Sequence, residues 1–215
     1  MTFTTRDDVR LQGELRRPDD DPLATAVVCH PHPLHGGSKD HPILWAIRNE
    51  LAGIRGMAVL GFNFRGVMDS AGAYGGGVDE LLDVRAAIDR VRREAPDRPS
   101  VLCGWSFGAN VAVREALDDE RVAALAMVGV PLTPNDLSLP PLPQAAELAA
   151  FRRPALLLCG DRDEYCPVDD ARRWAAAFPD GKLVVLEGTG HYLGRREREA
   201  AARIGTFMDE ALGLG

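Results

Sequence analysis

The sequence is short of the patterns that mark several classes of protein. None of its apolar runs approaches the length of a membrane-spanning helix. Its charged start, "MTFTTRDDVRLQGELRRPDD", is unlike a secretory signal peptide. Basic residues are outnumbered, 25 against 32 acidic, for a net charge of -7. That balance argues against a nucleic acid or an anionic membrane as partner. We therefore expect a cytoplasmic protein.

Cysteine is also scarce, and its spacing indicates no covalent or metal framework. No C-x-x-C pair is present, so neither a disulfide nor a zinc site is indicated. The glycine-rich stretch 72–80, "GAYGGGVDE", lacks the Lys and Ser/Thr of a phosphate-binding loop and is interpreted as a turn. We expect no cofactor. Three of the cysteines end apolar runs, which predicts buried packing; the four are Cys29, Cys103, Cys159 and Cys166.

What the chain does contain is an alternation of strand and helix patterns. Short apolar runs bounded by Gly and Pro are typical of strands buried on both faces of a parallel sheet. Extended segments near 2–5 and 9–16 have no helix between them, which predicts an antiparallel hairpin at one edge. The alternation predicts a single α/β domain over residues 1–215 with helices on both faces. Further strands are expected at 26–29, 58–64, 101–103, 122–128, 155–159 and 183–186, and helices at 41–51, 78–94, 107–117, 169–178 and 195–212.

One segment interrupts this alternation. Residues 130–154, "VPLTPNDLSLPPLPQAAELAAFRRP", are rich in Pro and Leu. The segment is too short for a separate domain and long for a loop, and loops of that size are often functional. We expect either a short flap over a site or a plain surface excursion.

A serine lies where a buried strand should end. Residues 104–108 read Gly-Trp-Ser-Phe-Gly and fit the G-x-S-x-G pattern of a nucleophile elbow, between an apolar run and a helical one. Such a turn exposes the hydroxyl of Ser106 above a helix N-terminus, where the Phe107 N–H can stabilise an oxyanion. The alternative is an ordinary helix N-cap serine.

A serine nucleophile needs a base, and the base needs a carboxylate. His191 follows the last expected strand in "LEGTGHYLG". Before it, "LLLCGDRDEYCPVDD" offers Asp161, Asp163 and Glu164 after another strand. The order Ser, acid, His places each group at the carboxyl edge of a parallel sheet, where such sheets hold their chemistry. The alternatives are a surface histidine and a solvated acidic loop.

Three motifs together resemble the α/β-hydrolases, specifically small, nearly lidless bacterial serine hydrolases. They are the elbow, "HPHPLHGG" at 30–37 and "FNFRG" at 62–66. The resemblance covers nearly the whole chain and implies the α/β-hydrolase fold, with an eight-stranded, mostly parallel sheet. The family's acid motif, G-x-x-D-x-x-[VC]-P, maps onto 160–167, so the resemblance selects Asp163 over Asp161.

The resemblance also suggests residues around the reacting group. The family's oxyanion loop aligns with residues 30–32. Because prolines 31 and 33 have no N–H, the second donor is the amide of His32 or, as the alternative, of Leu34. Met68 stands where the family often has glycine, which weakens any transfer of substrate preference. The candidate pocket residues are Leu34, Trp105, Met68 and Tyr192.

Histidines 30, 32, 35 and 41 raise the question of a metal site. The intervening prolines force an extended path, and no helical i, i+4 pair forms. We expect no metal, with His30 bonding to a nearby backbone group at a strand end.

These features predict a serine hydrolase that cleaves a small carboxylic ester, or a thioester, through an acyl-enzyme on Ser106. Two alternatives stay open. One is a cofactor-free haloperoxidase or perhydrolase activity of the same triad, and the other is a non-catalytic α/β-hydrolase scaffold that binds a ligand or partner. A haloalkane dehalogenase is excluded, since it needs an aspartate at position 106. The expected partner is a small ester-type molecule, and a homodimer is left open.

Overall fold

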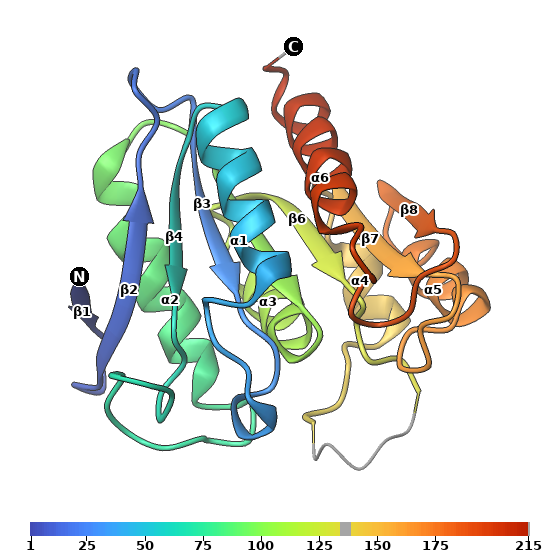
Figure 1. Cartoon of the computed structure of the whole chain (residues 1–215), viewed down its shortest axis with the longest axis horizontal. Coiled ribbons are helices and arrows are strands. Elements are labelled where there is room, and N and C mark those ends of the chain that lie inside the picture. Colours follow the sequence, from blue (N-terminus) through green and yellow to red (C-terminus); the bar gives the residue numbers. More distant parts are fainter. Residues whose placement is uncertain (134–138, 215) are drawn as a thin grey trace.

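The computed structural model describes residues 1–133 and 139–214 and contains one mixed sheet of eight strands in the order β1-β2-β4-β3-β5-β6-β7-β8 (Figure 1). All neighbouring strands from β4 through β8 run parallel. The predicted α/β-hydrolase architecture is confirmed. The strands are β1 (Thr2–Thr4), β2 (Arg10–Arg16), β3 (Ala24–Cys29), β4 (Met57–Phe62), β5 (Ser100–Trp105), β6 (Val122–Val128), β7 (Ala155–Gly160) and β8 (Gly181–Leu186).

The antiparallel hairpin predicted at one edge is present. β1 pairs with β2 in the register Thr2↔Gln12 to Thr4↔Arg10, and β2 runs antiparallel to β4. The turn between β1 and β2 is too short for a crossover helix, so these strands can only reverse direction. β4 ends at Phe62, two residues earlier than the sequence predicts.

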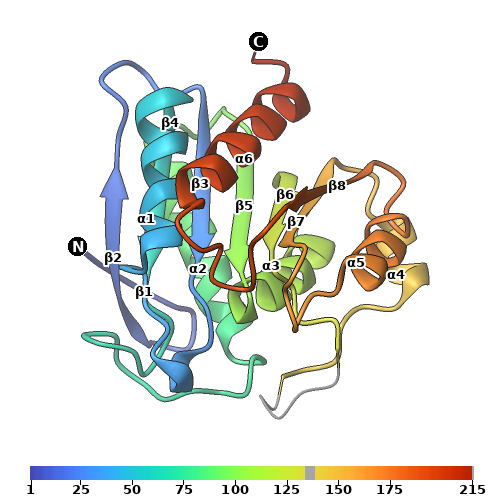
Figure 2. The ribbon, with the colours of Figure 1, turned by 45° about the vertical axis from the view of Figure 1, so that its right-hand side comes forward.

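Helices cover both faces of the sheet. α1 and α6 lie against one face, side by side in Figures 1 and 2, and α2, α3 and α5 lie against the other. α1 continues into a π-helical turn at Glu50–Ile54. The helices are α1 (Pro42–Asn49), α2 (Glu80–Val91), α3 (Phe107–Asp118), α4 (Ala145–Ala150), α5 (Val168–Ala175) and α6 (Glu197–Leu212).

The strands divide their side chains between two hydrophobic cores. In β3, Val27 and Cys29 belong to the core under α2 and α3, whereas Ala26 and Val28 belong to the core under α1. Every residue of β3, β4, β5 and β7 is buried, which explains why these strands appear in the sequence as unbroken apolar runs. The four cysteines are free and buried, and burial raises the pKa of Cys103 to about 12.

The loop after β4 is fixed by a buried ion pair. Arg65 donates from its backbone and guanidinium to Asp83 on α2, at 2.8–2.9 Å, and also contacts Asp7. The Asp83 side chain is fully buried, so removing either partner would leave an uncompensated charge in the interior. This pair ties the "FNFRG" loop to α2.

The Pro-rich segment 130–154 lies partly outside the described residues, which omit 134–138. Its later part forms α4, which the sequence did not predict, and buries Leu148 and Phe151 against the core. The flap therefore stays a prediction. Across the described ranges, no helix is both long and apolar enough to cross a membrane.

Candidate active site

Ser106 occupies a strained turn between β5 and α3. Its φ of 56° and ψ of -119° lie in a region that residues with a side chain rarely adopt. Its N–H donates to the carbonyl of Val128 at 2.8 Å, which holds the turn against the end of β6. Its hydroxyl makes no capping hydrogen bond to α3. The N-cap alternative therefore does not describe how this side chain is used.

The two glycines of the elbow permit close backbone contacts. A Cβ at Gly104 would lie 2.3 Å from the carbonyl oxygen of Gly108. A Cβ at Gly108 would lie 2.4 Å from the carbonyl oxygen of Cys29 and 2.5 Å from that of His30. Distances below 3.0 Å are not tolerated against backbone, so both positions require glycine. The result is that α3 begins directly against the end of β3.

His191 and Asp163 lie together at the same edge of the sheet. Nδ1 of His191 lies 3.0 Å from each carboxylate oxygen of Asp163, and both side chains are buried. A carboxylate can only accept, so Nδ1 carries the hydrogen and Nε2 is left as the basic nitrogen. The backbone amides of Tyr165 and Cys166 also donate to Oδ1 of Asp163, at 3.0 and 3.1 Å, and fix its orientation.

The other two acids of this loop lie elsewhere. Asp161 and Glu164 are exposed. Asp161 accepts the amide of Thr189 at 3.1 Å, and its pKa is lowered chiefly by a hydrogen bond from the Gly188 amide. Asp161 thus braces the loop that carries His191, whereas Asp163 contacts the imidazole itself.

Ser106 and His191 line the same small pocket, of about 120 Å³. Within the part of the chain that the structure describes, no hydrogen bond joins the Ser106 hydroxyl to the imidazole. The pocket is lined by Pro31, His32, His35, Gly36, Gly37, His41, Trp105, Ser106, Tyr165, His191 and Tyr192.

The predicted oxyanion donors come from two segments, Phe107 from the elbow and His32 from the loop after β3. Phe107 is the first residue of α3, so its amide has no acceptor within the helix. Its side chain is fully buried in the core rather than in the pocket. The ring of His32 accepts the Leu34 amide at 3.2 Å, which occupies the alternative donor. Of the two amides considered from the sequence, His32 is therefore the better candidate.

The four candidate pocket residues divide into two pairs. Trp105 and Tyr192 line the pocket, and Trp105 also belongs to the core on the α1 and α6 face of the sheet, with 1% of its surface exposed. Leu34 and Met68 are 68% and 72% exposed and are not among the lining residues. Leu34 lies in a short 3-10 helical turn (Pro33–His35) and Met68 in the turn after β4, and the sequence pattern did not specify the direction of either side chain.

The sequence analysis missed three aromatic contributions to the pocket. The ring centroids of Tyr165 and His191 lie 4.8 Å apart, and those of His41 and Trp105 lie 4.3 Å apart. His35 completes the wall through an edge contact with His32. Tyr165 could have been found, since it lies within the acid motif, two residues after Asp163.

Histidines of this cluster form hydrogen bonds with backbone groups. Nε2 of His30 accepts the Phe64 amide at 2.9 Å, and its Nδ1 donates to the carbonyl of Pro31. Burial lowers the pKa of His30 to about 4, which keeps the ring neutral. His41 caps α1 by accepting the Ile43 amide. Among the residues that the structure describes, no group of three or more His, Cys, Asp or Glu side chains could hold a metal ion.

Gly129, directly after β6, leaves room for the side chains of Asp163 and His191. It has a φ of +53°, and a Cβ there would lie 3.0 Å from Oδ2 of Asp163 and 3.1 Å from the His191 ring. We expect Gly129→Ala to lower kcat by roughly 100-fold, because the imidazole must move. Ester turnover measured beside circular dichroism checks this prediction.

The control for this substitution is Gly213→Ala. Gly213 has a comparable φ of +64° but open space around its Cβ. It therefore isolates the backbone cost of a left-handed alanine, about 1–2 kcal/mol. Equal losses of kcat in the two variants would contradict the steric explanation.

The chain belongs to the alpha/beta hydrolase domain family, which residues 24–211 match. It is also similar to an uncharacterised protein of Rickettsia prowazekii, with 29% identity over 209 residues, covering 93% of this chain and 84% of the relative.

Two solved structures support the same class. One is an α/β serine hydrolase without a lid from Xanthomonas campestris, 27% identical, with a TM-score of 0.81 over 99% of this chain and 94% of that one. The other is an α/β serine hydrolase homologue from Coxiella burnetii, also 27% identical, with a TM-score of 0.83 over 96% and 95% of the two chains. The similarity to these two structures agrees with the α/β-hydrolase class that the sequence motifs predict.

Proposed function

We propose that the protein is a serine hydrolase that cleaves small carboxylic esters or thioesters through an acyl-enzyme. Ser106 attacks the carbonyl carbon while His191 takes the hydroxyl proton at Nε2. Asp163 holds the imidazole and stabilises its charged form. His191 then gives the proton to the leaving alcohol or thiol. In the second half, water loses a proton to His191 and attacks the acyl carbon. The bond from that carbon to Oγ of Ser106 then breaks, His191 returns the proton to Oγ, and the carboxylic acid is released.

The observation that carries this proposal is the convergence of a strained serine and a carboxylate-held histidine on one small pocket. Strain of this kind persists only where the surrounding structure enforces it, and it concentrates at functional sites. Catalytic hydrogen bonds are often long without substrate and tighten in the complex. We therefore propose that the Ser106–His191 bond forms when an ester enters.

The charge that develops on the carbonyl oxygen also needs donors. In the proposed mechanism these are the amides of Phe107 and His32, each worth on the order of 3 kcal/mol in the transition state. The start of α3 adds the positive end of its dipole. The contact of Gly108 with the end of β3 supports this arrangement, because it brings the two amide-bearing segments together.

The size of the pocket predicts the size of the substrate. At about 120 Å³ it is well below the roughly 300–1,000 Å³ of drug-sized ligand pockets. We expect kcat/KM for p-nitrophenyl acetate to exceed that for the octanoate by about tenfold or more, since the longer chain cannot be enclosed. Initial rates across the acetate, butyrate and octanoate esters check this.

Two outcomes would count against the proposal. Faster turnover of the octanoate would place the acyl chain outside this pocket. Absence of hydrolysis across oxygen esters and the matching thioesters would reject the hydrolase reading itself. The Ser106→Ala protein supplies the blank for spontaneous hydrolysis.

A further inference from the structure

The glycine-rich stretch at residues 72–77, between β4 and α2, brings a tyrosine against the proposed oxyanion site. In Figures 1 and 2 the loop that contains it runs beside the loop after β3. The ring centroid of Tyr74 lies 5.0 Å from that of His32 and 5.8 Å from that of Phe107, and the latter two lie 5.1 Å apart. His32 and Phe107 carry the two amides that the proposed mechanism assigns to the oxyanion. Tyr74 therefore contacts both donor residues.

The hydroxyl of Tyr74 adds a polar contact to this packing. Its oxygen lies 3.3 Å from Nε2 of His32. Nδ1 of the same ring accepts the Leu34 amide, so in the neutral imidazole Nε2 carries the hydrogen and donates it to Tyr74. The carbonyl of His32 also accepts the amides of His35 and Gly37, at 3.1 and 3.0 Å. Both the ring and the backbone of His32 are thus held in one orientation.

The stretch that carries Tyr74 is itself anchored. The Glu80 carboxylate at the start of α2 is fully buried and accepts the amides of Gly75 and Gly77, at 2.8 and 2.7 Å. The stretch also lies against the "FNFRG" loop, since a Cβ at Gly66 would lie only 3.0 Å from Cα of Ala73. Tyr74 therefore projects from a supported segment, which a positioning role requires.

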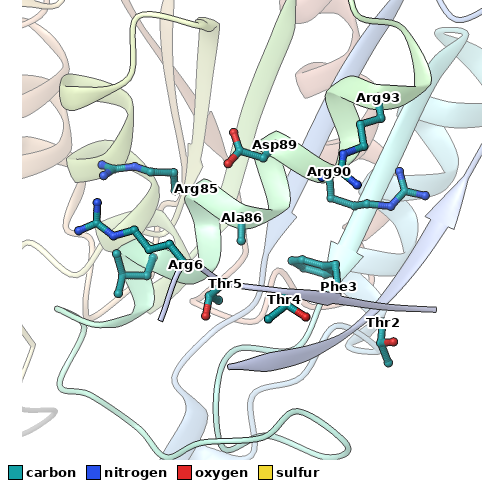
Figure 3. Close-up of a pocket in the computed structure, with 11 residues that line it drawn as sticks. Thr2, Phe3, Thr4, Thr5, Arg6, Arg85, Ala86, Asp89, Arg90 and Arg93 are labelled. Carbon is teal, nitrogen blue, oxygen red and sulfur yellow. The ribbon is translucent and has the colours of Figure 1, made fainter. Parts of the chain in front are cut away.

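Tyr74 lies outside the two cavities that border this region. It is not among the residues that line the pocket of Ser106, so it does not touch a substrate there. A larger cavity, of about 520 Å³, lies between β1 and α2, and neither Tyr74 nor His32 lines it (Figure 3). A substitution at Tyr74 can therefore affect the reaction only through the residues that it contacts.

We propose that Tyr74 is a positioning residue of the oxyanion hole, which sets the amides of His32 and Phe107 toward one developing oxyanion. This role rests on the proposed function, because the two amides act only if a tetrahedral intermediate forms at Ser106. Oxyanion donors stabilise the transition state and lose that effect when they are misplaced. The ester in its ground state carries no such charge, so its binding does not depend on Tyr74.

The first test removes the hydroxyl of Tyr74 and keeps its ring. In Tyr74→Phe we expect kcat for p-nitrophenyl acetate to fall about tenfold and KM to change by less than about twofold, as for a contact that acts only in the transition state. Tyr74→Ala also removes the packing against Phe107 and should lower kcat by roughly 100-fold. Initial rates over a range of ester concentrations measure both parameters, and circular dichroism confirms that each variant is folded.

Trifluoroacetone supplies a readout that a merely structural role would not change. Oγ of Ser106 bonds to its carbonyl carbon, the hydroxyl proton passes to Nε2 of His191, and the carbonyl oxygen becomes an anion in the oxyanion hole. In Tyr74→Phe its inhibition constant should rise by about tenfold, the same factor by which kcat/KM falls, because the adduct resembles the transition state.

The matched control removes a buried hydroxyl from the same connection between β4 and α2. The hydroxyl of Ser70 donates to the carbonyl of Asn63 at 2.7 Å and accepts the amide of Gln12 at 2.9 Å. Ser70→Ala should lower the melting temperature, because two hydrogen bonds are lost. It should leave kcat and the inhibition constant of trifluoroacetone within about twofold of the parent values.

Three outcomes would overturn the positioning role while leaving the proposed function intact. They are equal losses of kcat in Tyr74→Phe and Ser70→Ala, a rise in KM of Tyr74→Phe with kcat unchanged, and full activity of Tyr74→Phe beside an active parent. A parent chain that neither hydrolyses esters nor reacts with a fluorophosphonate would reject the proposed function, and the positioning role with it.

Discussion

Ser106→Ala is expected to abolish ester hydrolysis, lowering kcat by roughly 10⁵- to 10⁶-fold. The reason is that the acyl-enzyme cannot form without the hydroxyl, and the remaining donors can only polarise the carbonyl. A fluorophosphonate probe should label one serine of the parent chain and none of the variant. Intact-protein mass spectrometry measures the labelling, and initial rates with p-nitrophenyl acetate measure the loss of kcat.

A second serine provides the control for this result. Ser100 is also buried and is not among the residues that line the pocket. Its hydroxyl forms a hydrogen bond with that of Thr25 at 2.7 Å and accepts one from Arg92 at 3.0 Å. Ser100→Ala should cost about 1 kcal/mol of folding free energy and keep the label. If the label survives Ser106→Ala and disappears from another serine variant, Ser106 is not the nucleophile.

The sheet was predictable because burial on both faces leaves a plain signature. β5 and β7 lie at the centre of two helical layers, so every position must be apolar or small, and the sequence shows this as a continuous run. The hairpin was predictable for the opposite reason, since β2 alternates buried and partly exposed residues. Strand ends were less exact, because they depend on neighbouring loops.

α4 could not be predicted because it is held by local and tertiary contacts that leave little pattern. It has six residues, too few to show a helical period, and follows a run of prolines. Gln144 and Glu147 form a reciprocal capping box at its start, and Leu148 anchors it in the core. That anchoring decides the structure, and composition alone does not reveal it.

Met68 lies at a position where the family resemblance suggests glycine, a residue that readily adopts a left-handed conformation. Met68 adopts that conformation itself, with a φ of 50°, and its side chain points to solvent. The sequence analysis placed Met68 among the candidate pocket residues. The structure instead shows a strained residue outside the pocket-lining set.

The choice among three acids illustrates the limit of spacing as evidence. Residues 161, 163 and 164 all follow β7 closely enough to reach a histidine on the next loop. Only the folded turn distinguishes them, because the amides of Tyr165 and Cys166 turn the Asp163 carboxylate inward. The family resemblance in the sequence analysis also selected Asp163, but it carried no physical reason for the choice.

That distinction leads to a matched pair of substitutions. Asp163→Asn should lower kcat for p-nitrophenyl acetate by roughly 10⁴-fold, because an amide cannot hold His191 in the tautomer that leaves Nε2 basic. Asp161→Asn should lower it by no more than about tenfold, since it weakens only hydrogen bonds from the Gly188 and Thr189 amides at the surface. The two changes are chemically identical and lie two residues apart, so differences in loop composition cannot account for a thousandfold gap.

The pH dependence of Asp161→Asn provides a second readout. Hydrogen bonds from the Gly188 and Thr189 amides lower the pKa of Asp161 in the folded protein. A carboxyl whose pKa is lower in the folded than in the unfolded protein stabilises the fold at pH values above its pKa in the unfolded protein. That stabilisation is lost as the pH falls through its pKa in the folded protein. Asp161→Asn should therefore lower the melting temperature at pH 7, and the melting temperatures of the variant and the parent should converge in acid.

If Asp161→Asn instead abolished turnover at pH 7 while Asp163→Asn kept it, the acid would have to be reassigned to Asp161, and the loop would have to rearrange when substrate binds.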